Sequence, residues 1–140
     1  AGGLAKTPEG PAAWEDPGTL AACLAEPAQG AGGVISPPPT YCERRPARLT
    51  RHEVAFIADE VICGFGRTGN WWGSETFNIR PDTVSMAKAI TSAYMPLGAI
   101  TVSEPVSQAL VDYSKTLGVF AHAFTYSCHP VARALANKTL

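Results

Sequence analysis

Short apolar runs, each ended by a proline, a glycine or a charged residue, make up the hydrophobic pattern of this chain. The clearest run is VAFIA at residues 54–58, which continues into Asp59 and Glu60. A continuous apolar run of this length is typical of a strand covered on both faces in a parallel sheet. Further strands are predicted at residues 20–27, 82–87 and 97–103. The VAFIA strand therefore ends in two carboxylates, at the end of the strand where open α/β sheets bind their ligands.

Helical spacing is found in the second half of the chain. Residues 104–117 repeat apolar positions with a helical period and begin with Pro105 in the first turn. A second helix is predicted from Pro130 to the last residue. Residues 42–52 would pass as a solvated helix, but Pro46 should break or displace it, and SPPPTY just before should not be helical. Strands that alternate with helices or long crossovers predict an α/β layered domain.

Composition limits the class of protein. Residues 1–19 are rich in Gly, Pro and Ala and predict a loop or frayed end, which leaves one domain over 20–140. The net charge of −1, with 16% charged residues, gives no field that would attract nucleic acid or an anionic membrane. No run approaches the ~20 apolar residues of a membrane span, and the start lacks the pattern of a signal peptide. A soluble, cytoplasmic protein is therefore expected.

The four cysteines do not indicate a metal site or a disulfide framework. They are widely spaced, form no CxxC pair and have no histidine at zinc-ligand spacing. We expect buried or incidental thiols, and no metal.

Two glycine-rich segments have a phosphate-binding alternative. Residues 64–69 match GxGxxG, but two carboxylates and a cysteine separate them from the strand, and NWWGS is a poor helix start. Residues 30–33 lack the Lys-Ser/Thr ending of a phosphate-binding P-loop. Plain turns are preferred for both.

Lys88 and Asp59 are the candidate chemical groups. Lys88 stands alone in a small, largely uncharged stretch, and desolvation is how a lysine becomes nucleophilic near neutral pH. The alternative is a surface lysine at a strand end whose amine reaches solvent. Asp59 ends a buried strand, where a carboxylate needs a cation or donors. A pyridoxal ring needs such a group beside its ring nitrogen, so one strand end with Asp and a later one with Lys would bracket a ring.

The chain resembles a known family in three ordered segments. IADEVICGFGRTGNWWGS, PDTVSMAKAITSAYMPLGA and FAHAFTYSCHP, with AEPAQGAGGVISPP upstream, are similar to the class III pyridoxal-phosphate aminotransferases, over about residues 20–140. Within this family, the segments are most similar in sequence to the branch that transfers amino groups from ω-amino acids or diamines to pyruvate. The resemblance implies an internal fragment of a fold type I large domain, a mostly parallel sheet flanked by helices. It also implies a homodimer with pyridoxal 5'-phosphate.

The resemblance assigns roles to five residues. Lys88 would hold the cofactor as a Schiff base and then shuttle a proton, and Asp59 would pair with the pyridinium nitrogen. Val61 would pack on one face of the ring. Thr125 would donate to the cofactor phosphate of the neighbouring subunit, and Glu26 would lie near the substrate.

The chain departs from the family in ways that leave alternatives open. The upstream phosphate cup, the second ring-stacking aromatic residue and the C-terminal small domain are missing. Cys128 replaces a glycine, where a positive φ is expected. A truncated, catalytically inactive product of the same family is therefore the alternative to an active transaminase. A third possibility is a related aminomutase or decarboxylase.

Overall fold

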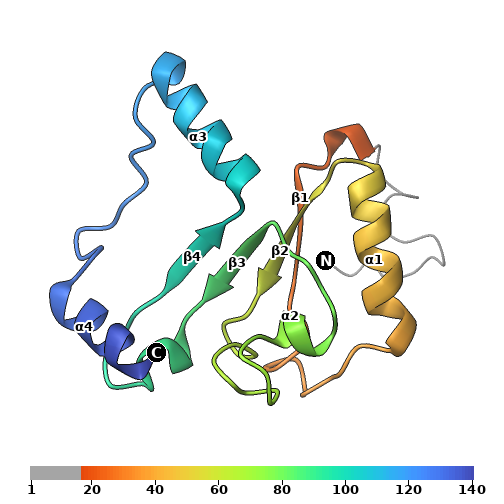
Figure 1. Cartoon of the computed structure of the whole chain (residues 1–140), viewed down its shortest axis with the longest axis horizontal. Helices are drawn as coiled ribbons and strands as arrows, with labels where there is room; N and C mark the ends of the chain where they lie inside the picture. The colour runs from red at the N-terminus through yellow and green to blue at the C-terminus, as the bar shows by residue number, and fades with distance from the viewer. Residues whose placement is uncertain (1–16) are drawn as a thin grey trace.

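The computed structural model describes residues 17–140, without the side chains of residues 17 and 42–46 (Figure 1). Most of the predicted N-terminal loop, residues 1–16, lies outside the described residues. In chain order the elements are η2 (Pro17–Thr19), β1 (Ala22–Ala25), α1 (Pro39–Arg51), β2 (Ala55–Asp59), α2 (Gly73–Thr76), β3 (Thr83–Met86), η3 (Lys88–Thr91), β4 (Ala99–Val102), α3 (Glu104–Leu117) and α4 (Pro130–Thr139).

The strands of the described region form one sheet in the order β1-β2-β3-β4. β1, β2 and β3 run parallel to one another, and β4 runs antiparallel to β3. All four predicted strands are confirmed: β1, β3 and β4 are shorter than the predicted runs, and β2 has the predicted length but lies one residue later. The parallel trio places the carboxyl ends of three strands at one edge of the sheet.

Strand register assigns side chains to the two faces, because paired residues point to the same side of a sheet. Ala58 pairs with Ala25 of β1 and with Val84 of β3. The hydrophobic core lies on this face in two clusters. Phe56 packs with Ile79; the second cluster is centred on Met86, Ile90 and Ala136. The helices α1 and α4 contribute Leu49 and Ala136 to these two clusters.

The opposite face of the sheet is largely open. Leu24 is 62% exposed and Ile100 66% exposed, and both belong to this face by register. Ala55 and Ile57 of β2 are half-buried there. VAFIA was predicted to be covered on both faces of the sheet. The described residues cover only the face that carries Phe56 and Ala58.

Helix α1 corrects two expectations. It begins at Pro39, inside SPPPTY, and runs through position 46 to Arg51. Pro39 fits because the first turn of a helix needs no backbone donors. Residue 46 cannot donate to the carbonyl four residues earlier, a defect of about 3 kcal/mol. Packing of Leu49 against the Phe56 cluster stabilises the helix beyond the proline, so tertiary contacts outweigh the local defect.

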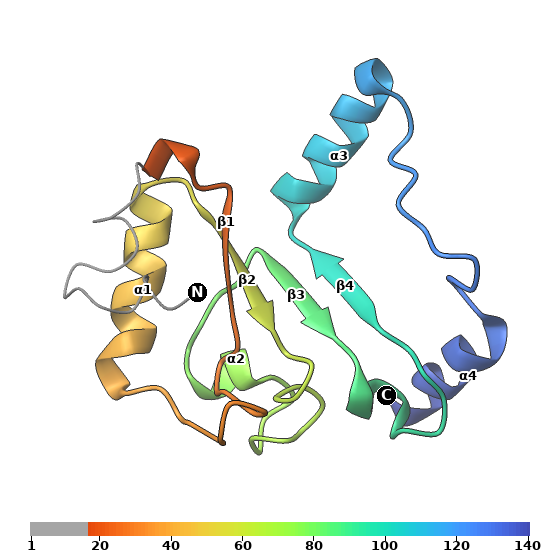
Figure 2. The ribbon, with the colours of Figure 1, turned by 180° about the vertical axis from the view of Figure 1, so that it is seen from behind.

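The two predicted C-terminal helices are confirmed at their expected positions. α3 buries none of its residues, whereas α4 buries Ala132 and Ala136. Both helices lie beyond β4, whereas α1 lies at the β1 side of the sheet; the front and back views agree on this arrangement (Figures 1 and 2). Within the described part of the chain, no helix has both the length and the apolar character needed to cross a membrane.

Candidate active site

The three parallel strands each end in a candidate residue. Glu26 follows β1, Asp59 is the last residue of β2, and Lys88 comes two positions after β3. Register pairs Ala25 with Ala58 and Asp59 with Ser85. Since neighbouring strands lie about 4.8 Å apart, the topology brings these residues to one edge of the sheet.

The thiol of Cys63 supports this convergence. Cys63 is buried in the turn after β2, and its Sγ donates to the carbonyl of Ala28 after β1 at 3.3 Å. Burial raises the pKa of the Cys63 thiol, and the nearby carboxylates of Glu60, Glu26 and Asp59 raise it further. One thiol therefore lies within electrostatic reach of carboxylates from two strand ends.

The adjacent carboxylates Asp59 and Glu60 point to opposite faces of the sheet, as the two-residue period of a strand requires. Asp59 is half-buried at the end of the open face, and its Oδ1 accepts a hydrogen bond from the Val61 N–H at 3.0 Å. Glu60 is fully buried on the covered face and accepts hydrogen bonds from Gly73 and Ser74. Sequence reasoning treated the two as one ligand-binding pair. The sequence carries no signal for this difference, because VAFIA is apolar at every position; in the structure the burial of residues 54, 56 and 58 continues with the same period to position 60.

Lys88 is exposed and has an unusual backbone. It is the first residue of η3 and has φ 49°, in the left-handed region that non-glycine residues rarely adopt. The following turn is closed by Thr91, a fully buried residue whose hydroxyl donates to the carbonyl of Met95 at 2.6 Å. Strained conformations of this kind concentrate at functional sites because the surrounding structure must hold them in place.

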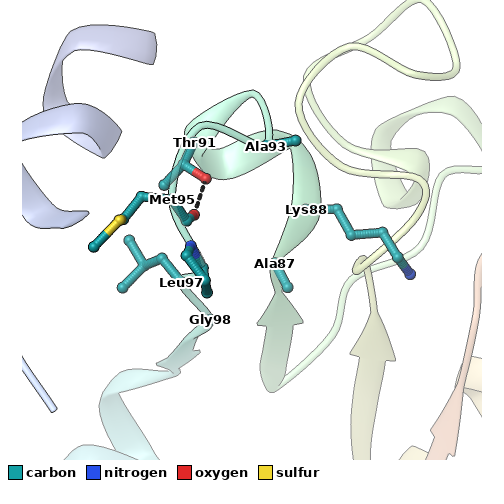
Figure 3. Close-up of a pocket in the computed structure, with 8 residues that line it drawn as sticks. Ala87, Lys88, Thr91, Ala93, Met95, Leu97 and Gly98 are labelled. Atoms are coloured by element: carbon teal, nitrogen blue, oxygen red, sulfur yellow. Dashed lines mark hydrogen bonds between the residues drawn. The ribbon is translucent and has the colours of Figure 1, made fainter. Parts of the chain in front are cut away.

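The Lys88 side chain stands beside a hollow. A shallow, mainly apolar hollow of about 630 Å³ is lined by Ala87, Lys88, Thr91, Ala93 and residues 95–98. In Figure 3 the lysine extends away from Met95 and Leu97, out from the turn that carries it. Within the described part of the chain, its amine forms neither a hydrogen bond nor an ion pair. An accessible primary amine of this kind can attack a carbonyl carbon.

These groups fit a pyridoxal ring. Asp59 has one oxygen held by the Val61 amide, and among the described residues its Oδ2 has no partner, so it can accept a hydrogen bond from a ring N–H. Lys88 supplies the free amine. In the same described region, no group of three or more His, Cys, Asp or Glu is placed to hold a metal ion.

The remaining predicted residues lie in two places. Glu26 is half-buried, and its Oε2 accepts from the Gly30 N–H at 2.7 Å, which joins the end of β1 to the start of the glycine turn. Val61 is half-buried beside Asp59. Thr125 is exposed in the long connection between α3 and α4 and does not line the Lys88 hollow. The structure thus brings four of the five residues to the strand ends and leaves Thr125 apart.

The connection between α3 and α4 confirms one detail. Cys128 has φ 61°, the positive value expected where the related sequences have glycine. The side chain of Cys128 is exposed.

The glycine segments are turns, as predicted. Residues 61–70 form a continuous turn region with positive φ at Gly66 and Gly69, and residues 31–33 form the other turn. The judgement that NWWGS is a poor helix start was wrong, because α2 begins at Gly73. Its single turn forms because the Glu60 carboxylate accepts the first N–H groups of the helix.

Comparison with known proteins links this geometry to one group of enzymes. The family described as aminotransferase class-III matches residues 12–140. The γ-aminobutyrate transaminase 3, chloroplastic, of Solanum lycopersicum is 56% identical over 126 residues, which are 90% of this chain and 24% of that protein. The vanillin aminotransferase of Capsicum frutescens is 52% identical over 126 residues, again 90% of this chain, and 28% of that protein.

Solved structures give the same result. The ω-transaminase from Pseudomonas jessenii, in complex with PMP, is 47% identical with a TM-score of 0.89, over 92% of this chain and 28% of that one. A transaminase from the marine bacterium Virgibacillus is 48% identical with a TM-score of 0.83, over 89% of this chain and 28% of that one. This chain thus spans about a quarter of the length of the proteins it matches.

Proposed function

We propose, from the premise that this chain belongs to the class-III aminotransferase family, that it carries the cofactor-binding lysine and aspartate of a transaminase. Its sheet with flanking helices is part of the fold type I arrangement of pyridoxal-phosphate enzymes. The proposed reaction moves an amino group from an amine or ω-amino acid to a keto acid such as pyruvate. The observation that carries the proposal is that Asp59 ends β2 and Lys88 follows β3, two parallel neighbouring strands whose carboxyl ends lie at the same edge of the sheet.

The proposed roles follow from the position of each group. Pyridoxal 5'-phosphate supplies an electron sink for the charge left when a proton leaves the substrate carbon. Lys88 would hold the cofactor through Nζ and, once free, would move that proton as a base and then an acid. Asp59 would accept the ring N–H, with one of its oxygens held by the Val61 amide. The Val61 side chain would pack against the ring.

The other assignments rest on the family resemblance. Glu26 is proposed to lie near the substrate and Thr125 to donate to the cofactor phosphate of a neighbouring subunit, in a homodimer. The exposure of Thr125, in the connection between α3 and α4, suits a role outside its own subunit.

The amine donor and the cell compartment are proposed only broadly. Among the relatives are proteins named for γ-aminobutyrate and for vanillin, which differ widely in shape and charge. Their names include chloroplastic and mitochondrial forms, and the cytoplasmic location expected from the sequence stays a prediction.

A second candidate concerns the 140 residues alone. The open sheet face, with Leu24 and Ile100 exposed, and the unburied helix α3 favour a catalytically inactive product when nothing else covers them. Exposed apolar surface of this extent normally marks an interface. One transamination assay, run on the full-length protein and on the isolated chain, tests both the proposal and this alternative.

The test is a transamination assay on the full-length gene product and on the 140-residue chain, each with pyridoxal phosphate, an amine donor panel and pyruvate. We expect alanine formation by the full-length protein and its loss in Lys88→Ala. Lys115→Ala is the matched control, because Lys115 is exposed and, among the residues that the structure describes, pairs only with Asp112 on its own helix. Full activity in Lys88→Ala would refute the proposal, and alanine formation by the 140-residue chain alone would refute the second candidate.

A further inference from the structure

We propose that Glu60 is a positioning residue for the cofactor site: its carboxylate anchors the turn after β2 and so fixes Asp59 and Val61 toward the ring. The inference rests on the proposed function. Glu60 lies between these two residues in the sequence but points to the opposite, covered face, where it is fully buried. It is therefore placed to act through its neighbours and has no access to the substrate.

Glu60 joins three segments. Its N–H donates to the carbonyl of Ser85 on β3 at 2.9 Å, and its carbonyl accepts from the Gly64 N–H at 2.9 Å. Its carboxylate accepts from the start of α2, with Oε2 2.9 Å from the Gly73 nitrogen and Oε1 2.6 Å from both the nitrogen and Oγ of Ser74. The neighbouring strand, the turn and α2 are thus held by one residue.

The contacts require a carboxylate. Both side-chain oxygens of Glu60 face donors, and a glutamine would place an N–H₂ group against at least one N–H. Among the described residues, the ion pairs do not include Glu60. Its charge is met by amide and hydroxyl donors alone, which are strong partners for an anion in a dry site.

The site leaves no room for a substitute partner. A Cβ on Gly73 would lie 2.7 Å from the Cβ of Cys63 and 3.0 Å from the Cβ of Pro27. These two residues come from the turns after β2 and β1. Glu60, Gly73 and Ser74 are all buried, so a donor that loses Glu60 would stay unpaired away from solvent at a cost.

The effect reaches Asp59 through one peptide group. The Val61 N–H, which holds Asp59 Oδ1 at 3.0 Å, belongs to the peptide that joins Glu60 to Val61. Anchoring Glu60 at its N–H, carbonyl and side chain fixes the plane of that peptide. When the anchor is weakened, the peptide is free to rotate, Asp59 loses its donor, and the Val61 side chain shifts at the same time.

The test compares Glu60→Gln with Glu75→Gln in the full-length protein. Glu75 is a matched control because it lies in α2, is exposed, and has a carboxylate that, within the described part of the chain, accepts only from the Trp72 N–H at 3.1 Å. We would measure the affinity for pyridoxal phosphate and the pH midpoint of the bound cofactor's visible absorbance. For Glu60→Gln we expect roughly tenfold weaker binding, because one buried donor loses its partner, and a shifted pH midpoint. Glu75→Gln should match the wild type.

Ser74→Ala keeps the inference testable if Glu60→Gln does not fold, since it removes one donor to Oε1 and leaves both backbone donors. A smaller shift in the same direction is expected. Wild-type affinity and pH midpoint in Glu60→Gln, or in Ser74→Ala when Glu60→Gln does not fold, would overturn the inference, even with a lowered unfolding temperature. A wild-type protein without any cofactor absorbance would instead refute the proposed function.

Discussion

Replacing Cys128 with glycine is expected to stabilise the protein. Residue 128 has φ 61°, where the Cβ of an L-residue crowds the following carbonyl. The turn that contains it does not depend on the thiol: the Phe124 N–H donates to Ser127 Oγ, and the Ser127 N–H to the Phe124 carbonyl, both at 2.9 Å. The Cys128 side chain is exposed, so glycine removes little packing.

The size of the effect follows from two opposing terms. Relief of the left-handed conformation contributes about 1–2 kcal/mol. The greater freedom of glycine in the unfolded chain offsets roughly 0.5–1 kcal/mol of this gain. The net increase in the free energy of unfolding is therefore about 0.7 kcal/mol, within a range of roughly 0–1.5 kcal/mol.

The measurement is the unfolding midpoint of Cys128→Gly in the full-length protein, with Cys128→Ala as control. Alanine removes the thiol but keeps the Cβ, so its midpoint should stay at the wild-type value. If alanine stabilises as much as glycine, the thiol and not the backbone is the cause. If glycine lowers the midpoint, the strain argument is refuted.

Three further predictions concern the core, the first helix and a buried thiol. Phe56→Ala should lower the free energy of unfolding by about 3 kcal/mol, because Phe56 is buried against Ile79; a change below about 1 kcal/mol in denaturant unfolding would contradict this packing. Pro46→Ala should raise the free energy of unfolding by up to about 3 kcal/mol, because it restores a backbone donor inside α1. An unchanged unfolding midpoint would contradict the continuous helix. Burial and nearby carboxylates raise the pKa of Cys63, so its thiolate forms only at higher pH, and iodoacetamide should label it later in a pH series than exposed Cys128. Equal labelling of the two peptides by mass spectrometry would contradict the burial.

Short apolar runs and helical spacing were sufficient to predict most elements of this fold. VAFIA and the other runs located every strand of the described sheet, and residues 104–117 matched α3 to its ends. These predictions succeed because a buried strand appears in the sequence as a short apolar run and a helix as apolar positions with a helical period. The antiparallel direction of β4 has no such signal, since the pattern of a strand does not state which way its neighbour runs.

Long-range contacts explain what sequence reasoning missed. Pro46 reads locally as a helix breaker, but the contact of Leu49 with the Phe56 cluster is non-local. NWWGS reads as a poor helix start, but the carboxylate of Glu60, thirteen residues before Gly73, accepts from the first N–H groups of the helix. The roles of Lys88 and Asp59 came from the family resemblance, and register then placed both at one edge.

The most direct test of the central claim is to find which lysine holds the cofactor. The full-length protein would be loaded with pyridoxal phosphate, treated with borohydride to make the bond permanent, digested and analysed by mass spectrometry. The account predicts a pyridoxyl group on Lys88 and none on the control Lys115. Modification that is spread over several lysines, or that persists at the wild-type level in Lys88→Ala, would contradict it.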